Sequence, residues 1–197
     1  MPPLIRVATA RDAEAISRIY APAVTERATS FELTPPDAGE MRRRIDTVLE
    51  QYPWLVVDSS DDVLGYVYAT KHRDRAAYRW SVDTAVYVRS DAWRRGIAKA
   101  LYSALFDVLV LQGYRNAYAG TTLPNESSVA AHESLGFKRV GIYHQVGYKI
   151  GKWHDVAWFE RALAERVLDP REPVPFSTIA ASPQVTSAFK RAEKFLR

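Results

Sequence analysis

The spacing of apolar positions along the chain changes between two patterns, one typical of strands and one typical of helices. Short apolar runs bounded by turn residues predict strands at 4–8, 54–57, 63–69, 78–88, 116–120, 138–148 and 152–161. Apolar residues three or four positions apart predict helices at 11–20, 36–51, 96–111 and 129–135. Strands and helices alternate and then end in a hairpin, which indicates an α/β fold with one mixed sheet and helices on both faces.

The composition changes near residue 170. Prolines at 170, 173, 175 and 183 predict an extended segment, and the pattern after Pro183 predicts an amphipathic helix. We therefore expect one domain at 1–169 and a Pro-rich C-terminal segment at 170–197 that packs on the surface or on a partner subunit.

Length and composition favour some classes of protein and exclude others. The chain has 197 residues, of which 47% are hydrophobic, and this is enough for one well-packed core. No apolar run approaches the ~20 residues that cross a bilayer, and 1–4 lack a signal-peptide pattern, so we expect a soluble cytoplasmic protein. Cysteine is absent, which excludes disulfides and a cysteine nucleophile. The net charge of +4 is scattered and does not indicate nucleic-acid binding.

A basic turn between a strand and a helix is the first candidate site. The backbone N–H groups of a first helical turn lack helical partners and carry partial positive charge, so they can bind phosphate. Gly96 and Ala98 permit close approach, and Arg94, Arg95 and Lys99 add full charges. The turn predicts a pyrophosphate site, and the alternative is an ordinary turn with a solvated basic loop.

The basic turn is one of four motifs that occur in a fixed order along the chain. Residues 86–88, the turn 94–99, Asn125 and 132–137 together resemble the acetyl-CoA motifs of the GCN5-related N-acetyltransferases. Segments 52–56, 84–88 and 151–156 resemble the phosphinothricin acetyltransferase branch, and the likeness spans about 5–163. Trp93 departs from the family, which usually has Gln or Arg there, and this removes one polar contact to the phosphates.

The resemblance implies the acyl-CoA N-acyltransferase fold, a central mixed sheet flanked by helices, with acetyl-CoA as co-substrate. In that fold the pantetheine arm pairs with strand backbone and the pyrophosphate sits on the basic turn. The implied cofactor-binding residues are Val86, Tyr87, Val88, Arg94, Arg95, Gly96, Ile97, Ala98, Lys99, Asn125 and Ser128.

The resemblance also implies direct acetyl transfer to a primary amine, which must first lose a proton. Asp83 stands where this branch usually has Glu and is the candidate base; its shorter side chain favours a bridging water. His132 is characteristic of the branch and is the candidate acid for the departing thiolate or a member of the proton relay. The alternatives are a surface or ion-paired carboxylate and a buried structural histidine.

For the acceptor amine, a guanidinium can clamp a carboxylate and aromatic rings can wall a small pocket. The candidates are Phe31, Arg75, Tyr78, Arg79 and Trp153, with solvated arginines and core aromatics as the alternative. His144, His154 and Asp155 suggest a metal, but adjacent strand residues point to opposite faces and no set of three ligands is evident. We expect no metal.

The sequence thus predicts an N-acetyltransferase that acts on a small amino-acid-like amine such as phosphinothricin, methionine sulfoximine or methionine sulfone, and that forms a homodimer. One alternative acceptor is an amine of a protein, a peptide or an aminoacyl-tRNA. Another alternative is an acetyl-CoA sensor without turnover, suggested by the departures at Trp93 and Asp83.

Overall fold

The computed structural model describes residues 2–60 and 62–197; Met1, and Asp61 in the polar turn predicted at 58–62, lie outside the described residues. Its strands form one sheet in the order β1-β2-β3-β4-β5-β7-β6. The pair β4–β5 is parallel and the other pairs are antiparallel, which confirms the predicted mixed sheet. The strands are β1 (Leu4–Val7), β2 (Trp54–Ser59), β3 (Asp62–Lys71), β4 (Ser81–Val88), β5 (Asn116–Leu123), β6 (Lys138–Lys149) and β7 (Lys152–Ala162).

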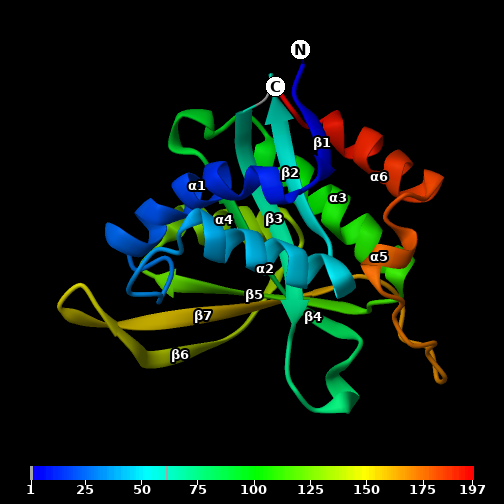
Figure 1. Cartoon of the computed structure of the whole chain (residues 1–197). Coiled ribbons are helices and arrows are strands. Elements are labelled where there is room, and N and C mark those ends of the chain that lie inside the picture. Colours follow the sequence, from blue (N-terminus) through cyan, green and yellow to red (C-terminus); the bar gives the residue numbers. More distant parts are fainter. Residues whose placement is uncertain (1, 61) are drawn as a thin grey trace.

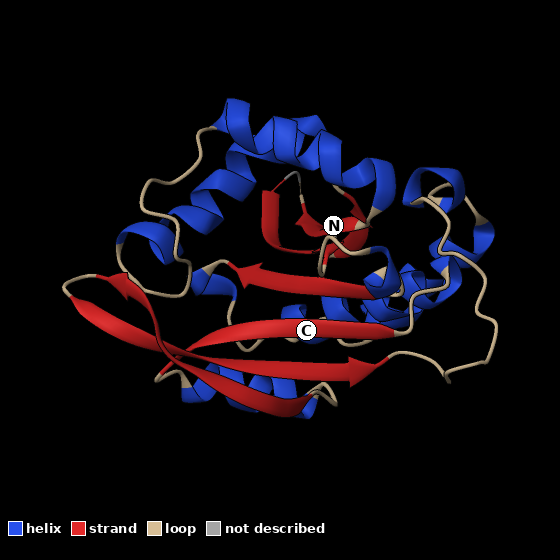
Figure 2. Ribbon diagram, turned by 90° about the horizontal axis from the view of Figure 1, so that it is seen from below, coloured by secondary structure: helices blue, strands red, loops and turns tan. Residues whose placement is uncertain are grey.

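Helices cover both faces of this sheet, as Figures 1 and 2 show. Helices α1 and α2 pack on one face, and α3, α4 and α6 pack on the other. The central helix is α3, whose Leu101, Leu105 and Leu109 are fully buried against the sheet. The helices are α1 (Ala13–Thr25), α2 (Ala38–Gln51), α3 (Ile97–Gln112), α4 (Glu126–Ser134), α5 (Phe176–Ile179) and α6 (Pro183–Glu193).

Several predicted boundaries are wrong; β5, for example, continues to Leu123, and α4 begins at Glu126. Helix α1 does not end at Tyr20 but continues through Pro22, because buried Ala23 and Val24 anchor its last turn and the Pro22 carbonyl accepts a hydrogen bond from the Glu26 amide at 3.1 Å. Strand β4 begins at Ser81 and not at Tyr78, because 76–78 form a 3-10 turn before it.

The C-terminal segment packs on this same chain. Phe176, Val185, Ala188 and Ala192 are buried, and α6 lies along α3 and beside β1 (Figure 1). Among the described residues, no helix is both long and apolar enough to cross a membrane.

Candidate active site

Strands β4 and β5 separate in the middle of the sheet. They pair only where Ser81–Asp83 lies beside Asn116–Tyr118. At the end of this pairing, the hydroxyl of Thr84 donates to the Tyr118 carbonyl at 3.0 Å, and beyond it β4 continues to Val88 paired with β3. A strand edge without a strand partner can hydrogen-bond an extended ligand. Because the two strands pair only at one end and then separate, they form a V-shaped opening with Asp83 at its apex.

Asp83 is paired with a histidine at this apex. Its Oδ1 lies 2.6 Å from Nδ1 of His72, whose ring stacks on Tyr118 with centroids 4.2 Å apart. An ionised carboxylate only accepts hydrogen bonds, so Nδ1 carries the proton. Burial raises the pKa of Asp83 above its usual value, and the hydrogen bond from His72 opposes this effect. The result is a carboxylate–imidazole pair suited to accept a proton.

His72 lies in the segment between the predicted strands 63–69 and 78–88, and the sequence patterns assign it no role. Only the register of the β3–β4 hairpin brings its ring to Asp83, because Thr70 lies opposite Asp83 and Lys71 opposite Val82. The contact could be predicted by aligning the two strands so that their alternating apolar residues share one face, which fixes the register between them.

Asp83 and His132 lie on opposite faces of the sheet. Strand β4 alternates, so Asp83 shares a face with Tyr87, whose ring is 4.9 Å from that of Tyr20 on α1. His132, on α4, lies on the α3 side, where its ring stacks on Phe159 at 5.4 Å and meets Tyr102 at 6.0 Å. The structure therefore does not bring the two predicted catalytic residues together on one face.

The surroundings of His132 favour its neutral form. The side chain is almost fully buried, and burial lowers its pKa, while the hydrogen bond between Nδ1 and the Ser128 carbonyl at 2.7 Å acts in the other direction. A carbonyl only accepts, so Nδ1 carries the proton and Nε2 keeps its lone pair. This tautomer can accept a proton at Nε2 more readily than it can donate one.

The basic turn leads from β4 into α3. Arg94 and Gly96 both have left-handed backbone, with φ of 61° and 78°. Helix α3 begins at Ile97, and within the described part of the chain no side chain caps its N-terminus. The amides of its first turn, with Arg94, Arg95 and Lys99 beside them, fit a pyrophosphate group.

Trp93 has a structural task in this turn. Its indole Nε1 donates to the Val88 carbonyl at 2.9 Å, and the guanidinium of Arg27 lies 5.2 Å from its ring centroid. The indole thus ties the turn to the end of β4, while the main-chain anion site beside it does not depend on the side chain at this position.

Asn125 caps α4, because its Oδ1 accepts the Ser128 amide at 3.1 Å. The Ser128 hydroxyl in turn lies 3.2 Å from that of Thr121 on β5. Asn125 and Leu123 line a groove of about 400 Å³ between β5 and α4. The cap leaves Asn125 at the rim of this groove, where its implied role in binding acetyl-CoA stays a prediction.

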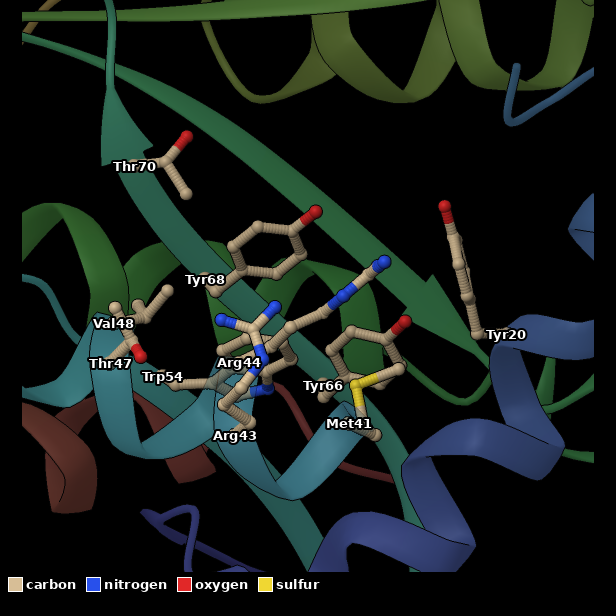
Figure 3. Close-up of a pocket in the computed structure, with 10 residues that line it drawn as sticks. All are labelled: Tyr20, Met41, Arg43, Arg44, Thr47, Val48, Trp54, Tyr66, Tyr68 and Thr70. Carbon is tan, nitrogen blue, oxygen red and sulfur yellow. The ribbon is translucent and has the colours of Figure 1, made fainter. Parts of the chain in front are cut away.

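A cavity of about 280 Å³ lies on the α1–α2 face. The stacked rings of Trp54, Tyr66 and Tyr68 form its floor, and Figure 3 shows the side chains of Arg43 and Arg44 rising from α2 toward the tyrosines. Thr70 lines the end of the cavity and is the cross-strand neighbour of Asp83, so both side chains point to the same face. The catalytic candidate therefore adjoins an aromatic cavity.

The loop before α2 borders this cavity. Glu32 accepts hydrogen bonds from the Tyr20 hydroxyl at 2.9 Å and from Arg44 at 2.7 Å, and the guanidinium holds the pKa of Glu32 below its usual value. Lys149 from β6 is buried and donates to the Ser30 carbonyl at 2.6 Å. Side chains from α1, α2 and β6 thus fix the loop in place.

The predicted acceptor residues are scattered. Tyr78 lies against His72, with ring centroids 5.8 Å apart, whereas Phe31 packs on Gly147 of β6. Arg79 pairs with Glu172 of the C-terminal segment, and Trp153 packs on Tyr148 at the exposed end of the β6–β7 hairpin. Arg75 is exposed. Of this set, Tyr78 lies at the Asp83–His72 pair, and none of the five lines the aromatic cavity.

The residues that suggested a metal make other contacts. Nδ1 of His144 lies 3.1 Å from Asp155, and Nε2 of His154 lies 2.9 Å from the Lys149 carbonyl. Across residues 2–60 and 62–197, no three metal-ligating side chains gather in one place.

Comparison with known proteins places this geometry in a family. Residues 5–158 match the acetyltransferase (GNAT) domain. The chain is 40% identical to phosphinothricin N-acetyltransferase of Streptomyces coelicolor over 142 residues, which are 72% of this chain and 78% of that protein. It is 33% identical to L-methionine sulfoximine/L-methionine sulfone acetyltransferase of Pseudomonas aeruginosa, over 87% of this chain and 98% of that protein.

A solved structure shows the same fold. The phosphinothricin acetyltransferase of Sinorhizobium meliloti, determined in complex with acetyl-CoA, superposes with a TM-score of 0.82 at 35% identity. The match covers 90% of this chain and 98% of that protein.

Proposed function

Since the chain belongs to the GNAT family of acetyltransferases, in its phosphinothricin acetyltransferase-like branch, we propose that it moves acetyl from acetyl-CoA to the amine of a small amino-acid-like substrate. Phosphinothricin, methionine sulfoximine and methionine sulfone are the first substrates to try, because they or close analogues are the acceptors of the named relatives. The observation that carries the proposal is the Asp83–His72 pair, which adjoins a small aromatic cavity at the apex of the V-shaped opening.

The chain's own residues suit acetyl-CoA. The uncapped start of α3 and the basic residues of the turn offer a site for its pyrophosphate, and the edge of β4 at Val86–Val88 offers backbone groups for its pantetheine arm. When bound, acetyl-CoA supplies the thioester that reacts. The strand edge would then direct that thioester toward the apex of the opening.

Asp83 has the role of proton acceptor in this proposal. An amino acid's ammonium is mostly protonated at neutral pH, so it must lose a proton before it attacks. The carboxylate, held by His72, takes that proton directly or through a water, and the neutral amine attacks the acetyl carbon. The C–S bond of the thioester then breaks, and the departing CoA thiolate takes the second proton that the nitrogen loses as the amide forms. His132 has the lesser role, a proton relay on the opposite face.

The cavity on the α1–α2 face would hold the side chain of the acceptor. Its volume of about 280 Å³ fits an amino acid and not a folded protein chain. Arg43 and Arg44 lie at its rim, where they pair with Glu40 and Glu32, so an acidic group on the substrate would compete with these carboxylates for the guanidinium groups.

Release of the CoA thiol, followed with a thiol reagent, tests the activity. The chain has no cysteine, so the protein adds no background signal. We expect turnover with small amines that carry a carboxylate and none with peptides. Turnover with peptides alone would favour a macromolecular acceptor, and silence across the panel with acetyl-CoA binding intact would favour a sensor.

We also propose a homodimer. The β6–β7 hairpin exposes several large apolar side chains, among them Val146, Tyr148, Ile150 and Trp153. Exposed apolar patches of this kind usually mark contact surfaces. Light scattering after size exclusion should give the mass of two chains, and Trp153→Glu should give that of one; a monomeric parent protein would contradict the proposal.

A further inference from the structure

The last residues of the chain contact the cofactor-binding turn. Helix α6 runs along α3, where Arg191 pairs with Asp107 at 2.8 Å, and it ends near the start of α3. The segment that follows, Lys194–Arg197, is called the C-terminal tail here. The Arg197 amide donates to the Arg95 carbonyl at 3.1 Å, so backbone joins backbone between tail and turn.

Gly96 shows how close this contact is. A Cβ atom on Gly96 would lie 1.8 Å from the Phe195 carbonyl oxygen, which is far too close for any side chain. Arg94 and Gly96 both have left-handed backbone, and a non-glycine residue in that region is strained unless its surroundings hold it. The tail binds Arg95, the residue between them, and so helps to hold the turn.

The tail also arranges positive charge. The ammonium groups of Lys99 and Lys194 lie 4.6 Å and 5.0 Å from the ring centroid of Phe195. Lys99 belongs to the first turn of α3 and Lys194 to the tail, so one aromatic ring gathers two cations beside the uncapped helix start. Their potentials add to that of the helix terminus, where the phosphates of acetyl-CoA are expected.

We propose that the C-terminal tail is part of the acetyl-CoA site: it holds the turn 94–96 in its binding conformation and brings Lys194 to the anionic end of the cofactor. Binding of the cofactor and docking of the tail then stabilise each other, because coupling between two sites is reciprocal. The tail follows α6, which packs along α3, so it reaches the turn from the side of α6. This inference rests on acetyl-CoA as cofactor and not on the identity of the acceptor.

Binding of CoA, measured by titration calorimetry, tests the role of the tail. Phe195→Ala and Lys194→Ala should each raise the Kd for CoA by on the order of fivefold or more, the lower end of typical couplings. The matched control is Arg191→Ala, which removes an equal charge where α6 pairs with Asp107 of α3 and not at the turn, and which should leave the Kd unchanged. If Lys194→Ala and Arg191→Ala raised the Kd for CoA equally, the effect would come from the loss of positive charge in general, and the proposal would be overturned.

Hydrogen exchange tests the reverse effect, that of bound CoA on the docking of the tail. Saturating CoA should slow exchange of the Arg197 amide in the parent protein, and this protection should be lost in Gly96→Ala, whose added Cβ displaces the Phe195 carbonyl. Exchange that does not respond to CoA in the parent protein would overturn the proposal. Neither measurement needs an amine, so the result is independent of whether the proposed acetyl transfer occurs.

Discussion

The two faces of the sheet carry two histidines in opposite surroundings. On the α1–α2 face, His72 pairs with Asp83 at the apex of the β4–β5 opening and beside an aromatic cavity. On the α3–α4 face, His132 is packed among Tyr102, Phe137 and Phe159 and bonds a main-chain carbonyl. Burial beside a carboxylate prepares a group for proton transfer, whereas burial among rings mainly keeps an imidazole neutral. Reactivity should therefore be concentrated on the α1–α2 face.

The change with the largest expected effect is Asp83→Asn. The amide keeps the shape and can accept from His72 but cannot take a proton, so kcat/KM should fall by roughly 10²- to 10⁴-fold. The Kd for acetyl-CoA should stay as it is. Activity within tenfold of the parent protein would remove Asp83 from the reaction.

The same variant has a stability signature. The folded-state pKa of Asp83 is raised, so the folded protein holds this proton more tightly than the unfolded chain. Its ionisation costs stability as the pH rises from the unfolded value of ~3.9 through the folded pKa. At neutral pH, Asp83→Asn should therefore melt at the same or a higher temperature than the parent protein, which thermal unfolding checks. A clear loss of stability would indicate a structural role for the carboxylate.

The second effect concerns His72→Phe. The ring keeps its stacking on Tyr118 but loses the donor to Asp83, so kcat/KM at neutral pH should fall by about tenfold or more. The hydrogen bond from His72 lowers the pKa of Asp83, so its loss should move the acidic limb of the pH–rate profile to higher pH. His144→Phe, which breaks a similar pair with Asp155 on the exposed hairpin, is the control and should leave the profile in place.

The third effect tests the other face. His132→Phe keeps an aromatic ring against Phe159 and removes the bond to Ser128. A relay role predicts a decrease in kcat of about tenfold or less, below the range of a direct general base, with the KM for acetyl-CoA unchanged. A decrease equal to that of Asp83→Asn would contradict the proposed difference between the faces, and an unchanged kcat would make His132 a packing residue.

Sequence patterns predict more of the fold than of the candidate site. Apolar spacing predicted the strands and the helix from Gly96, because burial against a sheet imposes that spacing. The motifs around Gly96 and Asn125 indicated the family because they concern backbone and caps, which are local. The pairing of His72 with Asp83 and the cavity end at Thr70 depend on the β3–β4 register, and the contact of Phe195 with Gly96 depends on tertiary docking. No local pattern shows these.

The smallest effects come from two threonines, one on each face. Thr70 lines the cavity beside Asp83, and Thr84 donates to the Tyr118 carbonyl on the α3 side. Replacing either by valine keeps the shape and removes one hydroxyl. Thr70→Val should raise the KM for the amine on the order of threefold without changing stability, while Thr84→Val should cost about 1 kcal/mol of stability because the carbonyl loses its donor. Steady-state kinetics and denaturant unfolding on both variants separate the two outcomes. Loss of a hydroxyl that contacts the substrate changes KM, whereas loss of a hydroxyl that only bonds the end of the strand pairing changes the free energy of unfolding. If Thr84→Val changed KM and Thr70→Val changed stability, the acceptor would lie on the α3 side.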